Sequence, residues 1–269
     1  MTDPVTRSVR ARLGRHGCEP CPQSLYEGEG ADFYELLVGS DRSEVREVLR
    51  LARRAAGDVL DLAAGGGRLT IPLLRAGAAV TALDLSADML AHLRVAAGPE
   101  AELVVRLGDM TAFDLGQRFG LIVLGATSIS LLDADGRRGL YSSVARHLAP
   151  RGIFAFSTAA DDAMAALSAP ADRVIAVEGP DGPEEVLFSQ EASPSGAERT
   201  VNFLRVGELR DGGAVRVFTS TLHVLAPGAL AAELRAAGFA EPERQEVRRA
   251  GGSPATASVI LSTTLAGAV

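Results

Sequence analysis

A run of small residues follows an acidic residue in the first half of the chain. Asp61 comes at the end of an apolar stretch, and Ala63, Gly65 and Gly67 follow it at every second position. Small residues let the backbone approach a ligand without a clash with a Cβ atom. In an open parallel sheet, ligands bind beyond the carboxyl ends of the strands. The loop 61–67 is therefore a candidate site for a ligand held against the backbone.

Two further acidic residues follow later apolar stretches. Asp84 comes directly after Val80-Thr81-Ala82-Leu83, and Asp109 follows the stretch 103–107. A carboxylate at the end of a second strand can accept hydrogen bonds from both hydroxyls of a ribose. Asp84 has a second interpretation as a helix N-cap, but Ser86 is also placed to fill that role. We therefore predict that the three carboxylates border one crevice.

The glycine loop is compatible with more than one ligand. A dinucleotide site has Gly-x-Gly-x-x-Gly at the turn between strand and helix. Here Gly65-Gly66-Gly67 is followed by Arg68-Leu69-Thr70, so the third glycine of that pattern is missing. An acidic residue ahead of the glycines also has no standard role in binding pyrophosphate. An NAD-dependent oxidoreductase is kept as the alternative enzyme class.

The loop resembles motif I of the class I S-adenosylmethionine-dependent methyltransferases, with Ala63 standing at the first glycine position. The segment 108–110 is similar to the family's adenine-binding region, and the resemblance extends over residues 57–160. It implies S-adenosyl-L-methionine as the cofactor and no metal. The donor-binding residues that we predict are Asp61, Ala63, Gly65, Gly67, Asp84, Leu85, Met89, Gly108, Asp109, Met110, Gly125 and Ala126.

Short apolar stretches alternate with helical stretches between residues 57 and 160. This alternation predicts βαβ units and a doubly wound parallel sheet, in the α/β class. The resemblance implies a Rossmann-like methyltransferase sheet of seven strands. We expect a mobile N-terminal arm (1–24), an N-terminal helical lid (25–56), the donor-binding core (57–173), an antiparallel β cap inserted after strand five (174–225), and a C-terminal helix with the last strands of the core (226–269).

The acceptor side is predicted from fewer residues. Aromatic residues of the lid and polar residues after strand four are the substrate candidates: Tyr26, Phe33, Thr127 and Ser128. Tyr26, Tyr34 and His223 are the catalytic candidates, since each can orient or deprotonate an amine. Histidine is the side-chain type best suited to accept a proton at neutral pH. A lone histidine on a strand is, however, more often a structural residue.

The segments 25–34 and 125–141 resemble the methyltransferases of daptide-type ribosomal peptide clusters. That resemblance implies N,N-dimethylation of a terminal amine on a modified peptide. Amino-sugar N,N-dimethyltransferases have a comparable lid, so a small-molecule amine is the alternative acceptor. A catalytically silent donor-binding partner of another enzyme is the non-enzymatic alternative.

The composition and charge of the chain limit the classes of partner that it can bind. A net charge of -7 and a pI near 5.2 disfavour nucleic acid, because the phosphate backbone is also negative. Membrane-length apolar runs and a signal-peptide pattern are both missing, which predicts a cytoplasmic protein with no membrane partner. Cys18 and Cys21 lack the second ligand pair of a zinc site and are interpreted as reduced surface thiols. A homodimer is left open.

Overall fold

A computed structural model of the chain describes residues 3–38, 41–99, 101–179, 182–210, 212–247 and 257–267. The fold divides into two compact units. One consists of Met1–Ser40 with Ala165–Val224 and is called the cap unit below. The other consists of Asp41–Met164 with Leu225–Val269 and is called the core unit. Each unit is therefore assembled from two separate segments of the chain.

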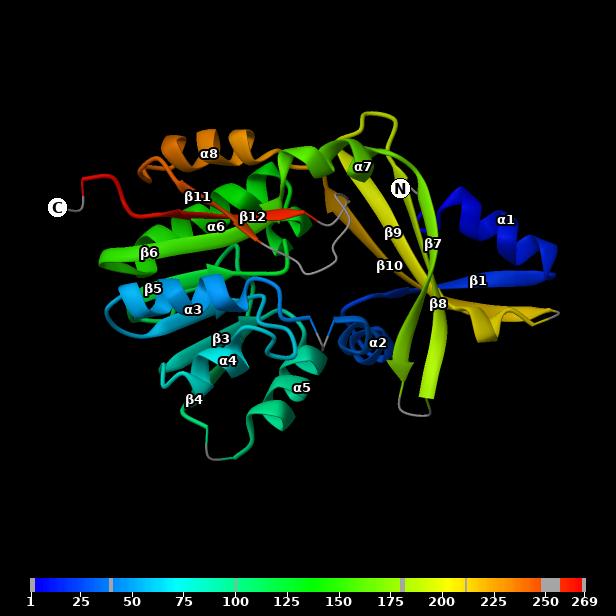
Figure 1. The fold of residues 1–269 in the computed structure, drawn as a ribbon, viewed down its shortest axis with the longest axis horizontal. Helices are drawn as coiled ribbons and strands as arrows, with labels where there is room; N and C mark the ends of the chain where they lie inside the picture. Colours follow the sequence, from blue (N-terminus) through cyan, green and yellow to red (C-terminus); the bar gives the residue numbers. More distant parts are fainter. Residues whose placement is uncertain are drawn as a thin grey trace. The chain divides into compact units, whose positions relative to one another are not determined.

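The core unit contains a seven-stranded mixed sheet with the order β11-β12-β6-β5-β2-β3-β4 (Figure 1). Strands β2 to β6 are parallel to one another, and β12 runs antiparallel to both β6 and β11. The sequence-based prediction of a Rossmann-like seven-stranded sheet is confirmed. Its elements are α3 (Val45–Arg54), β2 (Val59–Leu62), α4 (Thr70–Arg75), β3 (Val80–Asp84), α5 (Ala87–Ala97), β4 (Leu103–Leu107), β5 (Phe119–Leu124), α6 (Ala134–His147), β6 (Leu148–Ala159), α8 (Pro227–Ala236), β11 (Glu243–Val247) and β12 (Ser258–Thr263).

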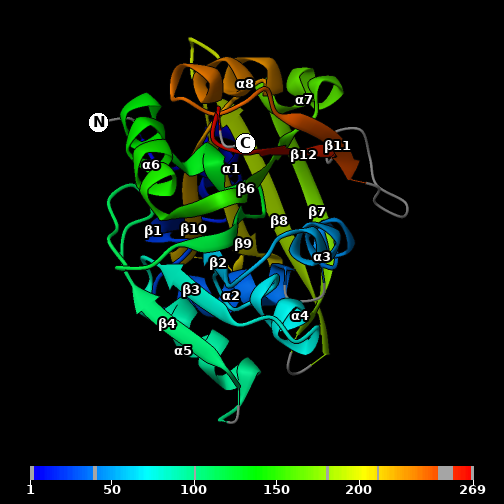
Figure 2. The same ribbon diagram turned by 90° about the vertical axis from the view of Figure 1, so that its left-hand side faces the viewer.

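Helices cover both faces of this sheet (Figures 1 and 2). Helices α6 and α8 pack against one face, and α3, α4 and α5 pack against the other. Strands β2 and β5 are buried along their whole length, which explains their continuous apolar sequence. The alternation of strand and helix thus gives three layers with the middle of the sheet enclosed.

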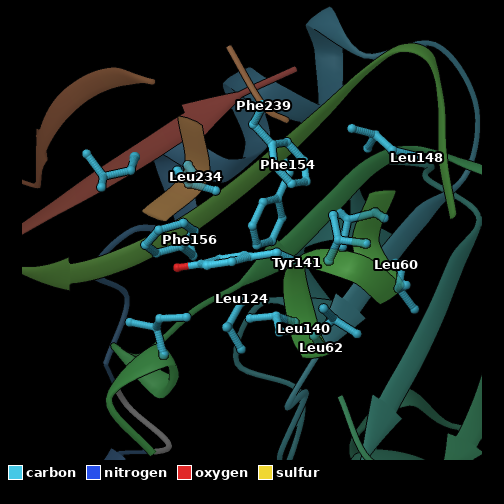
Figure 3. Close-up of a cluster of buried hydrophobic side chains, with 14 of the residues drawn as sticks. Leu60, Leu62, Leu124, Leu140, Tyr141, Leu148, Phe154, Phe156, Leu234 and Phe239 are labelled. Carbon is cyan, nitrogen blue, oxygen red and sulfur yellow. The ribbon is translucent and has the colours of Figure 1, made fainter. Parts of the chain in front are cut away.

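An aromatic cluster lies beneath α6 and α8 (Figure 3). The ring of Phe154 lies 6.5 Å from Tyr141, 5.4 Å from Phe156 and 5.9 Å from Phe239, measured between centroids. The Tyr141 hydroxyl donates to Glu233 at 3.2 Å, so the polar end of this buried ring is satisfied. The cluster joins β6, α6 and the segment after α8, which brings the C-terminal part of the chain into the core unit.

The cap unit is built on a five-stranded sheet with the order β1-β10-β9-β8-β7. Strand β1 pairs in parallel with β10, and the other pairs are antiparallel. Helix α1 packs against one face of the sheet, here called the α1 face, and α2 packs against the other, the α2 face. The elements are α1 (Arg7–Arg15), β1 (Cys18–Ser24), α2 (Glu29–Val38), α7 (Met164–Ser168), β7 (Ala171–Gly179), β8 (Gly182–Ala192), β9 (Glu198–Arg205) and β10 (Gly213–His223).

The prediction of a mobile N-terminal arm over residues 1–24 is wrong, because α1 and β1 lie there. Val5, Val9 and Leu13 recur at every fourth position and are all buried, which is the helical spacing that the sequence-based interpretation overlooked. The lid expected over 25–56 is also divided, since α2 belongs to the cap unit and α3 to the core unit.

Replacing Phe154 by Ala tests the aromatic cluster. The ring is fully buried, so its removal leaves a cavity and should lower the free energy of unfolding by about 3–5 kcal/mol. Val95→Ala is the matched control, because Val95 is 84% exposed on α5 and its loss should change stability by less than about 0.5 kcal/mol. Denaturant unfolding of the full chain measures both, and equal midpoints for the two variants would contradict this account of the core.

Candidate active site

The point where the strand order reverses lies between β2 and β5 of the core unit. From β2 the chain proceeds outward through β3 and β4, then returns to place β5 on the other side of β2. The carboxyl ends of the strands at such a reversal border the ligand crevice of a doubly wound sheet. Strands β2, β3 and β4 are adjacent; Asp61 is the last residue but one of β2, Asp84 ends β3, and Asp109 comes two residues after β4. The structure thus brings the three predicted carboxylates to one sheet edge.

The glycine loop makes a tight turn directly after β2. Ala63, Gly65 and Gly67 have φ angles of 48°, 55° and 98°, in the region that favours glycine. A Cβ at Gly67 would lie 2.6 Å from the side chain of Leu93, so this glycine allows close packing against α5. A Cβ at Gly65 would meet no atom within 4 Å. Gly67 is therefore needed for packing, whereas the backbone at Gly65 faces open space.

Asp84 joins the glycine loop to the next strand. Its Oδ2 accepts a hydrogen bond from the Gly65 amide at 2.8 Å, and its Oδ1 accepts one from the Ser86 amide at 2.8 Å. Ser86 is the N-cap of α5, as predicted, and its hydroxyl accepts from the Met89 amide at 3.2 Å. Burial raises the pKa of Asp84 while these amides oppose the rise. Asp84 thus orders the loop, and each oxygen keeps capacity for a further donor.

Asp61 is enclosed beneath the same loop. It is 2% exposed, and its Oδ2 accepts a hydrogen bond from the Thr70 hydroxyl at 2.6 Å. Burial raises its pKa to about 7, while Thr70 and Arg68 oppose the rise. The carboxyl group therefore fixes the start of α4 against the end of β2.

The ends of β3 and β4 carry exposed apolar side chains. Leu85 is 71% exposed and Leu107 is 63% exposed. Asp109 is also exposed, and its Oδ1 accepts from the Thr111 amide at 2.7 Å. The amide of Gly108 donates to the carbonyl of Asp84 at 2.9 Å, which holds the two strand ends together.

This edge fits an adenosyl donor by three observations. The backbone at Gly65 is open, the carboxylates of Asp84 and Asp109 lie at neighbouring strand ends, and Leu85 offers apolar surface beside them. Two predicted donor residues are less accessible. Met110 is half-buried against the core cluster, and Met89 is 2% exposed. Met89 therefore packs in the core unit rather than presenting a surface to a ligand.

The loop after β5 has an unusual backbone. Ala126 and Thr127 have φ angles of 55° and 56°, a conformation that side-chain-bearing residues seldom adopt. The Thr127 amide donates to the Ser157 hydroxyl at 2.9 Å, and the Ser128 amide donates to the carbonyl of Gly125 at 2.9 Å. Strain of this kind is found at functional sites when the surroundings hold it in place. The predicted residues 125–128 therefore form one ordered turn.

A residue that the sequence did not single out supports this turn. Glu44 is 2% exposed, and its Oε2 accepts from the Ala126 amide at 3.1 Å and from Arg68 at 2.9 Å. Arg68 follows the glycine loop directly, so Glu44 links the turn after β2 with the turn after β5. A narrow hollow beside this contact is lined by Glu44, Val48, Leu69, Val123, Leu124, Gly125, Ala155, Phe156, Ser157 and Ile260. The only sequence signal for Glu44 was its position directly ahead of α3.

The aromatic candidates belong to the cap unit. Tyr26 and Tyr34 pack edge to face, with ring centroids 5.1 Å apart, and Tyr26 hydrogen-bonds Ser220. Burial raises the pKa of Tyr26, so its phenol stays protonated at neutral pH and acts as a hydrogen-bonding group rather than a base. Phe33 is fully buried and stacks on Phe218 at 4.5 Å. Its position is that of a core residue of the cap unit, not of a substrate contact.

His223 lies apart from the tyrosines within the cap unit. It ends β10, and its Nδ1 is 3.6 Å from Oε1 of Glu198, its register partner on β9. Side chains alternate between the two faces of a strand, so His223 and Ser220, three positions apart, point to opposite faces. Tyr26 lies on the face of Ser220. The structure therefore brings Tyr26 and Tyr34 together but not His223.

Comparison with known proteins agrees with this architecture. The methyltransferase domain family model matches residues 59–152. The glycopeptide N-methyltransferase MtfA, solved with S-adenosyl-L-methionine, is 32% identical with a TM-score of 0.67, covering 98% of this chain and 100% of that one. A dTDP-3-amino-3,6-dideoxy-alpha-D-glucopyranose N,N-dimethyltransferase from Streptomyces fradiae is 36% identical over 142 residues. A dTDP-3-amino-3,4,6-trideoxy-alpha-D-glucopyranose N,N-dimethyltransferase from Streptomyces venezuelae is 31% identical over 137 residues.

The fold and the strand-end site define a Rossmann-like transferase. The chain belongs to the class I S-adenosylmethionine-dependent methyltransferases, and it is an enzyme of that class. The dinucleotide interpretation of the glycine loop is thereby rejected. The matches cover 49% and 48% of this chain and 54% and 56% of the two curated relatives, so the chain spans about half the length of each.

Within the described ranges, no helix is long and apolar enough to cross a membrane. Likewise, no cluster of three or more histidine, cysteine or acidic side chains suited to a metal ion occurs in the described part of the chain. Cys18 and Cys21 are both free cysteines. Cys21 is exposed, but Cys18 is buried, so the expectation of two surface thiols is wrong for Cys18.

The buried carboxyl of Asp61 should make stability depend on pH. Its pKa of about 7 in the folded chain exceeds the ordinary 3.8, so ionisation costs the folded state more than the unfolded state. The stabilisation that the protonated Asp61 carboxyl contributes to the folded state is complete below about pH 3.8 and is lost as the pH rises through about 7. Relative to Asp61→Asn, the wild type should lose up to about 1.4 kcal/mol per pH unit in that window.

Unfolding free energies of both proteins across this pH range provide the measurement. Thr70→Val removes the hydrogen bond that lowers the pKa, so it should extend the loss to higher pH. Parallel pH profiles for wild type and Asp61→Asn would contradict the assignment.

Proposed function

We propose that this methyltransferase transfers a methyl group from S-adenosyl-L-methionine to an amine nitrogen of a natural-product intermediate. The observation that carries the proposal is the sheet edge at which the backbone of Gly65 faces open space while its amide bonds Asp84. The similarity to N-methyltransferases supports nitrogen as the atom that accepts the methyl group.

The donor is assigned to the strand ends of the core unit. Asp84 is proposed to accept hydrogen bonds from the ribose hydroxyls. Each of its oxygens accepts one bond from the amide of Gly65 or Ser86 and can accept another. Asp109 and Leu85 are proposed to bind the adenine, the first by hydrogen bonding and the second by apolar contact. The loop residues Ala63, Gly65 and Gly67 are proposed to hold the methionine part of the donor, and Gly108, Met110, Gly125 and Ala126 to complete the site.

When bound, the donor supplies a methyl group on a positively charged sulfur, which an amine lone pair displaces in line. The chain's part is to hold the amine within about 3–3.5 Å of that methyl group and to exclude water. The amine must also be neutral, because a protonated nitrogen has no lone pair. An alkylamine has a pKa near that of lysine, about 10.4, so desolvation or a hydrogen-bond acceptor must favour its neutral form.

Thr127 and Ser128, which belong to the core unit with the donor residues, are proposed to orient the amine. Tyr26 and Tyr34, which belong to the cap unit, are kept as candidates for binding the acceptor. The raised pKa of Tyr26 supports a role in hydrogen bonding to the acceptor rather than in proton abstraction. His223 is kept as the candidate proton acceptor because of its side-chain type alone. It lies beside Glu198, on the opposite face of the cap sheet from Tyr26.

For the acceptor itself, we propose the terminal amine of a modified ribosomal peptide, methylated twice. The support is the resemblance of the segments 25–34 and 125–141 to daptide-type methyltransferases. The similarity to two amino-sugar N,N-dimethyltransferases and to a glycopeptide N-methyltransferase supports an amino sugar or a glycopeptide as strongly. Both acceptors present an amine to the same donor, so the chemistry above applies to either.

Asp84→Asn tests the donor site. The amide keeps the shape of the side chain but replaces one acceptor oxygen by a donor, so affinity for S-adenosylhomocysteine should fall by about tenfold or more. Calorimetric titration gives the affinity, and thermal unfolding of the same samples shows whether the loop is still folded. Asp88→Asn, on the exposed start of α5, is the control that should keep wild-type affinity. Unchanged affinity in Asp84→Asn would reject the ribose assignment.

Methyl transfer is tested by mass spectrometry with the donor and two acceptor panels. One panel contains peptides with a free terminal amine, and the other contains nucleotide-linked amino sugars. We expect mass gain in steps of one methyl group on one panel, with a second step on prolonged incubation. Gain on amino sugars alone would overturn the peptide assignment, and gain on hydroxyl groups with no gain on amines would overturn the proposed N-methylation.

A further inference from the structure

Four arginine side chains lie on the α2 face of the cap sheet. Arg199 and Arg205 alternate with Phe203 along β9, Arg216 shares the face of Phe218 on β10, and Arg173 lies over Phe188. Two of the four are neutralised. Arg205 pairs with Glu184 at 2.8 Å, and Arg216 pairs with Glu208 at 2.6 Å and Glu29 at 2.7 Å. The remaining two are Arg173 and Arg199.

No carboxylate lies within ion-pair distance of Arg173 or Arg199 among the residues that the structure describes. The guanidinium of Arg173 lies 5.1 Å from the ring centroid of Phe188. Arg199 is partly buried and donates to Oε1 of Gln190 at 2.7 Å. The chain as a whole has an excess of acidic residues, with a net charge of -7. These two cations are therefore not a consequence of a shortage of carboxylates.

Gln190 is held so that its oxygen faces Arg199. Its Nε2 donates to the carbonyls of Ala166 and Ala169, both at 2.7 Å, which leaves Oε1 as the acceptor for the arginine. This arrangement fixes one edge of the Arg199 guanidinium. The planar group has five N–H donors, and the hydrogen bond to Gln190 uses one of them.

The surroundings of Arg199 favour an added negative charge. Burial and the neighbouring charge of Arg173 together lower its pKa to about 10, while Tyr26 opposes the change. A partly buried cation beside a second cation is unfavourable unless an anion compensates both. The Tyr26 phenol and Ser220 lie beside it as neutral hydrogen-bonding groups.

We propose that Arg173, Arg199 and Tyr26 form a subsite for an anionic oxygen group, a carboxylate or a phosphate, carried by the methyl acceptor. The proposal rests on the proposed function, because it assumes an acceptor. The donor residues all belong to the core unit, whereas this subsite belongs to the cap unit. Arginine suits the role because its fork can bind two oxygens of a carboxylate or phosphate at once.

The test uses small anions as probes of the full chain. Sodium pyrophosphate and sodium succinate are titrated calorimetrically at low ionic strength into wild type, Arg199→Gln, Arg173→Gln and Arg205→Gln. Wild type should bind one of the two probes, and the preferred probe identifies the group as phosphate or carboxylate. Loss of a charge-assisted hydrogen bond should weaken binding by about tenfold or more in Arg199→Gln and Arg173→Gln. Arg205→Gln should stay within about twofold of wild type, because Glu184 already neutralises that arginine.

The alternatives give different results. Absence of binding of both probes to wild type overturns the proposal, as does equal weakening by Arg199→Gln and Arg205→Gln. If Arg199→Gln does not fold, Arg173→Gln decides the outcome, since the Arg173 side chain is exposed. S-adenosylhomocysteine is titrated into the same samples. If a variant no longer binds the probe but still binds S-adenosylhomocysteine, the loss is due to the anion subsite. If wild type fails to bind S-adenosylhomocysteine, the proposed function is wrong.

Discussion

The hydrogen bond from the Gly65 amide to Asp84 connects the parts of the donor site. It fixes the turn after β2 against the end of β3, while Thr70 and Asp61 fix the other side of the same turn. A loop of small residues has little side-chain packing to hold it, so its shape depends on polar contacts from its neighbours. The open backbone at Gly65, the position of Asp84 and the start of α4 all follow from these two contacts.

A second pair of contacts extends this order across the strand reversal. Glu44 bonds both Arg68, which follows the glycine loop, and Ala126, in the strained turn after β5. A buried carboxylate is costly unless it is paired and hydrogen-bonded, and Glu44 is both. The two turns that border the site are therefore held by one side chain from the segment ahead of α3.

The core unit was largely predictable from the sequence, whereas the cap unit was less so. Alternating apolar strands and helices, with Asp61, Asp84 and Asp109 after three strands, predict a donor site because parallel strand ends meet at one edge. Helix α1 was missed because only Val5, Val9 and Leu13 mark it in a polar segment. Contacts between distant segments, such as Glu44 with Ala126 or Arg216 with Glu29, leave no local pattern. Phe33 was expected at the substrate, but its ring completes the core of the cap unit.

The pairing of β1 with β10 has a consequence for how the chain folds during synthesis. Strand β1 leaves the ribosome early, yet its parallel partner β10 is made only after the first segment of the core unit is complete. Contacts so distant along the chain form late, because a long loop must close before they are gained. The core segment 41–164 can therefore collapse first, while β1 still has no partner strand. A nascent chain of this kind exposes the thiol of Cys18, which is buried only once the cap sheet has closed.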